Sequence, residues 1–131
     1  MEHPKPTAGM RHVALHVRDL EAAERFYVDL LGMEVEWRPD PDNVYLTSGT
    51  DNLALHRSGA DFDLSQQVLD HIGFILRTPQ EVDDWYAFLR ANHVEMKSEP
   101  RTHRDGARSF YLLGPEGVTV QMISHQPIAS C

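Results

Sequence analysis

The sequence predicts an α+β fold made of two copies of one βαβββ module, and an internal repeat is the main observation behind this prediction. Residues 11–30 (RHVALHVRDLEAAERFYVDL) match residues 70–89 (DHIGFILRTPQEVDDWYAFL) without gaps at an offset of 59. Residues 49–56 (GTDNLALH) match residues 114–121 (GPEGVTVQ) at an offset of 65. The change of offset places roughly six extra residues in the second copy, around the segment SEPRTHRDGARS.

The repeat also sets the domain organisation, since each copy contains one strand, one helix and then three short strands. We expect one domain over residues 10–124. Its parts and flanking segments are a flexible N-terminus (1–9), module one (10–57), a polar linker (58–68), module two (69–124) and a C-terminal tail (125–131).

In module one, the first strand alternates with the period of two that is typical of strands. The alternation gives an apolar face and a face with two imidazoles, respectively Val13, Leu15 and Val17, and His12, Ala14 and His16. Asp19 is expected to cap the following helix, which ends at Gly32. The segments MEVEWR, NVYLTSG and NLALHRS are then predicted to be strands.

In module two, Thr78 and Glu81 form the sequence pattern of a capping box, with Pro79 at the first helical position. The segments VEMKSE, SFYLLG and VTVQMIS are predicted to be its last three strands. The aromatic residues at helical spacing in both modules are expected to pack between helix and sheet.

Composition excludes several classes of function. Twelve basic and twenty acidic residues give a net charge of −8, so we expect no binding to nucleic acid or to anionic membranes. No apolar run approaches the roughly 20 residues needed to span a bilayer. The single cysteine, Cys131, cannot form an intrachain disulfide, which fits a cytoplasmic location.

The first strand with its histidine, the segment FYVDLLGM and the turn SFYLLGPEG resemble one known superfamily. It is the glyoxalase/bleomycin-resistance/extradiol-dioxygenase superfamily, also called the vicinal oxygen chelate superfamily, and the resemblance covers about residues 10–124. It implies a curved mixed sheet around a cleft, a homodimer, and in many members a divalent metal ion in the cleft. The modules of such proteins pair within one chain or between two, and the sequence leaves both arrangements open.

The resemblance implies a metal site on the sheet face opposite the helices. His12 and His71 match positions that carry ligands in metal-dependent relatives, whereas Gln121 stands where these relatives have glutamate. His56 matches a fourth position, usually glutamate in glyoxalase I enzymes. The expected ligands are therefore His12, His56, His71 and Gln121, a set that suits zinc, nickel, iron or manganese.

Without a carboxylate at the site, the proton carrier is expected to be His16, His103 or a metal-bound hydroxide. A basic cluster in the inserted segment consists of Arg101, Arg104 and Arg108 beside His103. It is expected to hold a carboxylate or phosphonate of a small-molecule substrate through charge-assisted hydrogen bonds. An ordinary solvated loop is the alternative.

Two classes of function follow. The first is a divalent-metal-dependent enzyme of lyase or isomerase type, similar to glyoxalase I, that polarises a carbonyl or vicinal oxygens; an extradiol-type dioxygenase is an alternative enzyme class. The second is a metal-free binding protein of bleomycin-resistance type, whose expected feature is an aromatic-lined cleft. The aromatic residues Phe26, Trp85 and Phe88 are assigned to helices, which favours the metal-dependent enzyme.

Overall fold

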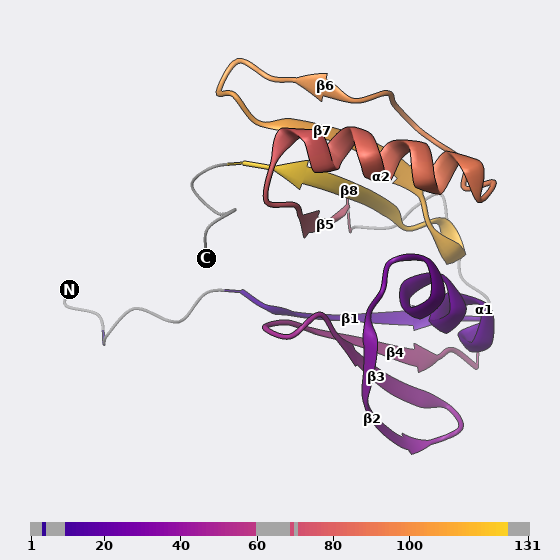
Figure 1. Ribbon diagram of the computed structural model, residues 1–131. Helices are drawn as coiled ribbons and strands as arrows, with labels where there is room; N and C mark the ends of the chain where they lie inside the picture. The colour runs from indigo at the N-terminus through magenta and orange to yellow at the C-terminus, as the bar shows by residue number, and fades with distance from the viewer. Residues whose placement is uncertain (1–3, 5–9, 60–68, 70, 126–131) are drawn as a thin grey trace. The chain divides into compact units, whose positions relative to one another are not determined.

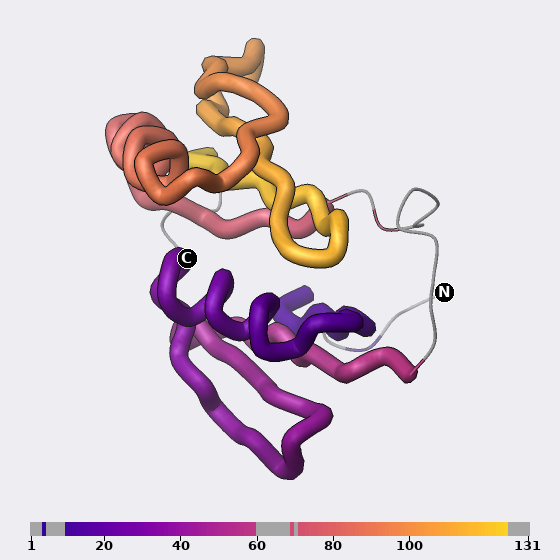
Figure 2. The backbone as a smooth tube through the Cα atoms, turned by 90° about the vertical axis from the view of Figure 1, so that its right-hand side faces the viewer, coloured from indigo at the N-terminus to yellow at the C-terminus, as the bar shows by residue number. Residues whose placement is uncertain are grey.

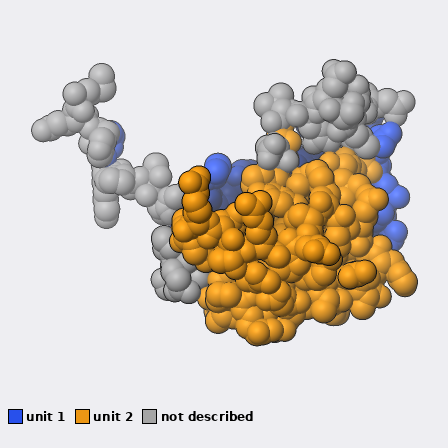
Figure 3. Space-filling view, turned by 90° about the horizontal axis from the view of Figure 1, so that it is seen from above, with its two compact units in different colours: residues 1–60 blue, residues 61–131 orange. Residues whose placement is uncertain are grey.

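The computed structural model describes residues 4, 10–59, 69 and 71–125. The chain divides into two compact units, residues 1–60 and 61–131 (Figure 3). Their boundary lies within the expected linker, and most of that linker falls outside the described residues, as do most of the expected N-terminus and C-terminal tail. No helix in the described part of the chain is long and apolar enough to span a membrane.

Unit 1 has the predicted βαβββ order (Figure 1). Its elements are β1 (His12–Val17), α1 (Leu20–Arg25), the π-helix η1 (Phe26–Leu30), β2 (Glu34–Asp40), β3 (Asn43–Thr47) and β4 (Asn52–Arg57). The sheet order is β1-β4-β3-β2, with β1 parallel to β4 and the other pairs antiparallel. The expected mixed sheet is therefore confirmed in this unit.

The helical segment of unit 1 begins as predicted and contains one irregular turn. Asp19 Oδ1 accepts a hydrogen bond from the backbone N–H of Ala22 at 3.0 Å, so Asp19 is the N-cap. The α-helix then widens into a π-helix, whose last turn closes when the N–H of Leu31 donates to the carbonyl of Phe26 at 3.2 Å. The segment ends at Gly32, where φ is +78°.

The helical segment covers one face of the unit 1 sheet (Figure 2). The sheet side chains of this face are buried, namely Leu15, Val17, Val44, Leu46, Leu53 and Leu55. In β1 they alternate with exposed residues, as predicted: His12, Ala14 and His16 are exposed, while Leu15 and Val17 are buried.

Unit 2 repeats the βαβββ order. Its elements are β5 (Ile72–Ile75), α2 (Pro79–Ala91), β6 (Arg101–Thr102), β7 (Arg108–Leu113), the short 3-10 helix η3 (Pro115–Gly117) and β8 (Thr119–Ser124). The sheet order is β5-β8-β7-β6, with β5 parallel to β8. Helix α2 starts at the predicted capping box, because Thr78 Oγ1 accepts from the N–H of Glu81 at 3.2 Å and Glu81 Oε2 accepts from the N–H of Thr78 at 3.2 Å.

The strand predicted over VEMKSE is wrong. Met96 makes only an isolated bridge to Leu112, and the edge strand of unit 2 is β6, inside the inserted segment. The hydroxyl of Ser98 accepts from the N–H of Tyr111 at 2.9 Å, where a continuing strand would offer a backbone carbonyl. This side-chain acceptor interrupts the ladder after one bridge.

Candidate metal-binding and substrate-binding faces

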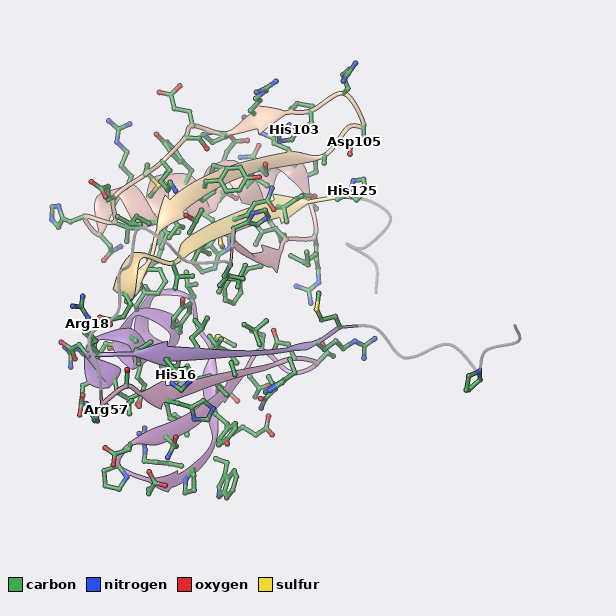
Figure 4. The ribbon with its side chains drawn as sticks, turned by 180° about the vertical axis from the view of Figure 1, so that it is seen from behind. His16, Arg18, Arg57, His103, Asp105 and His125 are labelled. Atoms are coloured by element: carbon green, nitrogen blue, oxygen red, sulfur yellow. The ribbon has the colours of Figure 1, made fainter. Side chains whose placement is uncertain are left out.

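In each unit we call the sheet face that lies away from the helix its open face. In unit 1 the alternation along the strands places a set of polar and aromatic side chains there. They are His12, His16, Trp37, Asn43, Tyr45 and His56, and the small Ala54 lies among them. Figure 4 shows His16 on β1, and Arg57 at the end of β4.

The ring of His12 is held by its neighbour on β4. Nδ1 of His12 lies 2.8 Å from Oδ1 of Asn52, its cross-strand partner. Because an amide oxygen only accepts hydrogen bonds, Nδ1 is the donor, and in the neutral ring Nε2 is then the atom with the lone pair. A metal-ligating histidine has the same arrangement, with one ring nitrogen donating to a second group and the other free to ligate.

His56 is held by a longer chain of hydrogen bonds. Both carboxylate oxygens of Asp40 accept from Nδ2 of Asn43, at 2.9 and 3.0 Å. This fixes the amide so that Oδ1 of Asn43 faces Nδ1 of His56 at 2.6 Å. The Nδ1 of His56 therefore donates, and in the neutral ring its Nε2 is the atom with the lone pair.

The strand register separates His12 from His56. His12 lies opposite Asn52, whereas His56 lies opposite His16, with ring centroids 6.1 Å apart. His56 is thus four residues further along the sheet than His12, about 13 Å at about 3.3 Å per residue. The structure brings His16 next to His56 and keeps His12 away from both.

The registers also correct the equivalence drawn from the repeat. His12 lies two residues before Ala14, which pairs with Ala54, and His71 lies two residues before Gly73, which pairs with Gln121. The counterpart of Gln121 in unit 1 is therefore Ala54. The sequence offset of 65 had matched Gln121 with His56, because short alternating strands can be aligned two residues out of step without changing face.

Two aromatic residues lie on the open face of unit 1 that sequence reasoning did not place there. Trp37 stacks on Tyr45 with centroids 5.1 Å apart and an interplanar angle of 22°, and Tyr45 contacts the ring of His56 edge-on at 5.8 Å. Trp37 is 59% exposed. The alternation of Tyr45 with the buried Val44 and Leu46 was a usable signal, since it places Tyr45 away from the helix.

On the open face of unit 2, Tyr111 connects two of the predicted ligands. Its ring contacts His71 edge-on, with centroids 5.3 Å apart, and its hydroxyl accepts from Nε2 of Gln121 at 3.1 Å. The amide of Gln121 is thereby oriented, and its Oε1 lies beside Gly73, which contributes no side chain. The structure thus brings His71 and Gln121 together around one residue that the sequence analysis did not single out.

Arg108, which was predicted to contribute to an anion-binding cluster, is paired with a carboxylate on the helix side of its strand. Its guanidinium donates to both carboxylate oxygens of Asp83 on α2, at 2.7 and 3.0 Å, and to Thr102 at 3.0 Å. Arg108 alternates with Ser109 and therefore points to the helix side of β7. The hydrogen bonds with Arg108 lower the pKa of the Asp83 carboxyl and raise that of the guanidinium.

Other basic residues do lie on or beside the open face of unit 2. Arg101 pairs with Ser109 across the β6–β7 ladder and so shares its face. His103 places Nε2 2.9 Å from the hydroxyl of the buried Ser109. Lys97, which was not predicted, donates to Thr119 Oγ1 at 2.7 Å. Arg104 is exposed in the turn between β6 and β7.

Among the described residues, no three His, Cys, Asp or Glu side chains are gathered closely enough to hold a metal ion. The donors described above are single histidines, a histidine pair and an amide, distributed over two units. Residues 9–122 match the family described as the Glyoxalase/Bleomycin resistance protein/Dioxygenase superfamily. The chain belongs to this superfamily.

Solved structures of the superfamily resemble the whole chain. A lactoylglutathione lyase from Agrobacterium tumefaciens is 26% identical, with a TM-score of 0.78, over 95% of this chain and 98% of that one. A glyoxalase/bleomycin resistance protein/dioxygenase from Nocardioides is also 26% identical, with a TM-score of 0.71, over 94% and 85% of the two chains. A related structure from Alicyclobacillus acidocaldarius, at 24% identity and a TM-score of 0.71, has the same fold over 90% and 92%. None of the curated protein sequences matches the chain.

Proposed function

We propose that the protein is a divalent-metal-dependent enzyme of the glyoxalase I type, a lyase or isomerase that acts on a small carbonyl compound. The observation that carries the proposal is the orientation of two donors by neighbouring side chains. Asn52 holds Nδ1 of His12, and Tyr111 holds Nε2 of Gln121. The atoms that these two hydrogen bonds do not use, Nε2 of His12 and Oε1 of Gln121, are the ones that could ligate a metal.

The donor set fits a divalent transition metal. His71 and Gln121 in unit 2 offer an imidazole nitrogen and an amide oxygen, and His12 in unit 1 offers another imidazole nitrogen. Donors of these types suit zinc, nickel, iron or manganese. We leave His56 out of this set because it lies four residues further along the sheet than His12. When bound, the ion would supply Lewis-acid polarisation of a substrate carbonyl.

Basic residues and histidines of the chain indicate the charge of the substrate and the groups that would move its proton. Lys97 and Arg101 bring two positive charges to or beside the open face of unit 2, so we propose an anionic small-molecule substrate. His16 and His103 remain the proposed proton carriers, because none of the three proposed ligands is a carboxylate that could move a proton. Gln121 also stands where a two-histidine, one-carboxylate triad needs its carboxylate, so we do not propose a dioxygenase.

Reconstitution tests this function. The untagged protein is stripped with a chelator, reloaded separately with zinc, nickel, manganese or iron(II), and assayed with the hemithioacetal of methylglyoxal and glutathione and with other small 2-oxo compounds. We expect turnover only after reloading, and loss of turnover in His71→Gln. The matched control is His93→Asn, an exposed histidine with φ of +64°, a conformation that asparagine tolerates. Equal turnover in the stripped and reloaded proteins would contradict the proposal.

A second candidate function is supported by Trp37 and Tyr45. A metal-free binding protein of bleomycin-resistance type is expected to present aromatic surface, and these two stacked rings provide it on unit 1. A planar ligand should quench the fluorescence of Trp37, one of only two tryptophans. Saturable quenching that is unaffected by a chelator and lost in Trp37→Phe would favour this function.

We also propose, from superfamily membership, that the protein is a cytoplasmic homodimer. Sedimentation equilibrium measures the mass directly, and one chain has a mass of 14.9 kDa. A species of twice this mass is expected, whereas a monomer at micromolar concentrations would contradict the proposal.

A further inference from the structure

We infer that His16 and His56 form a second transition-metal site, a cross-strand histidine pair that lies entirely within unit 1. It uses none of the metal donors of the proposed enzyme function and does not depend on that function, although His16 is also one of the two proton carriers proposed for it. The two residues are direct partners across the parallel β1–β4 ladder, so their side chains leave the sheet on the same face. His16 is exposed and His56 is partly exposed, so an ion can reach the pair from solvent.

The spacing of the rings suits one ion. A zinc or similar ion lies about 2.0–2.1 Å from a ligating imidazole nitrogen, hence about 3.2 Å from the centre of that ring. Two rings on one ion therefore have centres at most about 6.4 Å apart. The centroids of His16 and His56 are 6.1 Å apart, and the rings are tilted by 51°. Small rotations about their side-chain torsions are enough to direct both rings at a shared ion.

The hydrogen bonds around His56 prepare it for ligation. Asp40 holds the amide of Asn43, and Asn43 holds Nδ1 of His56, so the lone pair lies on Nε2. The carboxylate also polarises the amide, which makes the imidazole a stronger donor to a metal. A histidine that merely faced solvent would need neither group.

A further residue holds the turn that carries Asp40 and Asn43. Arg57 donates to Asp42 Oδ1 at 2.9 Å and to the carbonyl of Pro41 at 3.2 Å. Its guanidinium is in turn bound by Glu21 at 2.7 Å, which ties the turn to α1. The side chains behind His56 are therefore themselves fixed to the sheet and the helix.

The chemistry of the pair selects the ion. Two imidazoles with the remaining positions open to water suit Cu(II), Ni(II) and Zn(II), and affinity for such ligands follows the order Mn < Ni < Cu > Zn. The open positions leave room for a small oxygen-donor or nitrogen-donor ligand. The pair is expected to prefer Cu(II) and to bind Mn(II) weakly.

Competition titration with a chromogenic chelator tests the site on the untagged full chain. All proteins carry His3→Gln, because a histidine at the third position of a chain can bind Cu(II) and Ni(II) together with the amino terminus. The test variants are His16→Gln and His56→Gln, and the control is His93→Asn. We expect each test variant to lose at least tenfold in Cu(II) affinity at one site, and the control to lose none.

Two further variants separate the pair from the other donors. Asn43→Ala keeps both histidines but removes the group that orients His56, so Cu(II) affinity should fall about 10- to 100-fold, as for other groups that orient metal ligands. His71→Gln should leave the affinity of the pair unchanged, whatever it does to enzyme activity. Cu(II) electron paramagnetic resonance should show coupling to imidazole nitrogen that is lost in His16→Gln.

Unchanged Cu(II) affinity in both His16→Gln and His56→Gln, with native circular dichroism, would overturn the inference. So would a Cu(II) site that disappears in His71→Gln and persists in His16→Gln, since the ion would then belong to the donors of the proposed enzyme function.

Discussion

Units 1 and 2 share one topology and differ most on their open faces. The residues that face the helices correspond across the repeat, as Leu15 does to Phe74 in sequence. On the open faces His12 corresponds to His71, but other positions differ: His16 aligns with Ile75, and Ala54 is the counterpart of Gln121. One face of each sheet is constrained by the packing of its helix, while the other is free to acquire polar groups. This is why the repeat predicts the fold well and the chemistry poorly.

The two units also use their outer hairpins differently. In unit 1 the β2–β3 hairpin carries Trp37, which stacks on Tyr45, and the Asp40–Asn43 pair, which orients His56. In unit 2 the corresponding edge strand is the two-residue β6, and the hairpin carries Arg101 and His103. The first arrangement supplies stacking surface and oriented imidazole, and the second supplies positive charge.

The largest expected effect tests whether the two cores contribute equally. Leu46→Ala in unit 1 should cost about 2–5 kcal/mol and Phe110→Ala in unit 2 about 3–5 kcal/mol, because both side chains are fully buried against a helix. Urea unfolding, followed by circular dichroism, measures both losses. A loss below about 1 kcal/mol in only one variant would show that the two cores are not equivalent.

The next effect concerns the one open-face position at which unit 2 has a donor and unit 1 has alanine. Gln121→Glu preserves the shape of the side chain and adds a negative charge beside the proposed ion. Coulomb attraction should raise zinc or nickel affinity about tenfold or more, equivalent to about 1.4 kcal/mol. Chelator competition measures the gain, and His16→Gln is the control that should show none at this site. An unchanged or weaker affinity would mean that Gln121 does not face the ion.

A smaller difference is expected between the two helix starts. Thr78→Ala removes one half of a reciprocal capping box and should destabilise unit 2 by about 1 kcal/mol, whereas Asp19→Ala removes a single cap from a shorter helix. We expect the loss for Thr78→Ala to be equal or larger in thermal unfolding. The opposite order would indicate that the π-helix of unit 1 depends strongly on its cap.

The smallest effect is pH-dependent. Arg108 lowers the pKa of Asp83 in the folded protein below its ordinary value of 3.8, so the pair stabilises the fold above about pH 4 and loses this contribution as the pH falls through the lowered value. Both side chains are partly exposed, so the gain is below about 1 kcal/mol. The difference in unfolding free energy between the parent and Asp83→Asn should therefore be present at pH 7 and disappear once the pH falls below the lowered pKa of Asp83. A constant difference would exclude the ion pair as its cause.

Sequence alone predicted the βαβββ order, both helix caps and the faces of the first strands, because these depend on short-range periodicity and capping chemistry. It could not predict the register between β1 and β4, since a shift of two residues preserves every buried position. For that reason the sequence wrongly matched Gln121 with His56 instead of Ala54. The position of Arg108 was mistaken because the inserted segment was treated as a loop, whereas strand pairing places its guanidinium against Asp83 on α2.

We propose above that His12, His71 and Gln121 are metal donors. The most direct measurement is the metal content of the protein purified without a histidine tag, by inductively coupled plasma mass spectrometry, for the parent, His12→Gln, His71→Gln and the control His93→Asn. All proteins carry His16→Gln, so that the histidine pair of unit 1 does not contribute. We expect bound divalent metal in the parent and in the control, and almost none in His12→Gln and His71→Gln. Full metal content in both of these variants, or none in the parent after reloading, would contradict it.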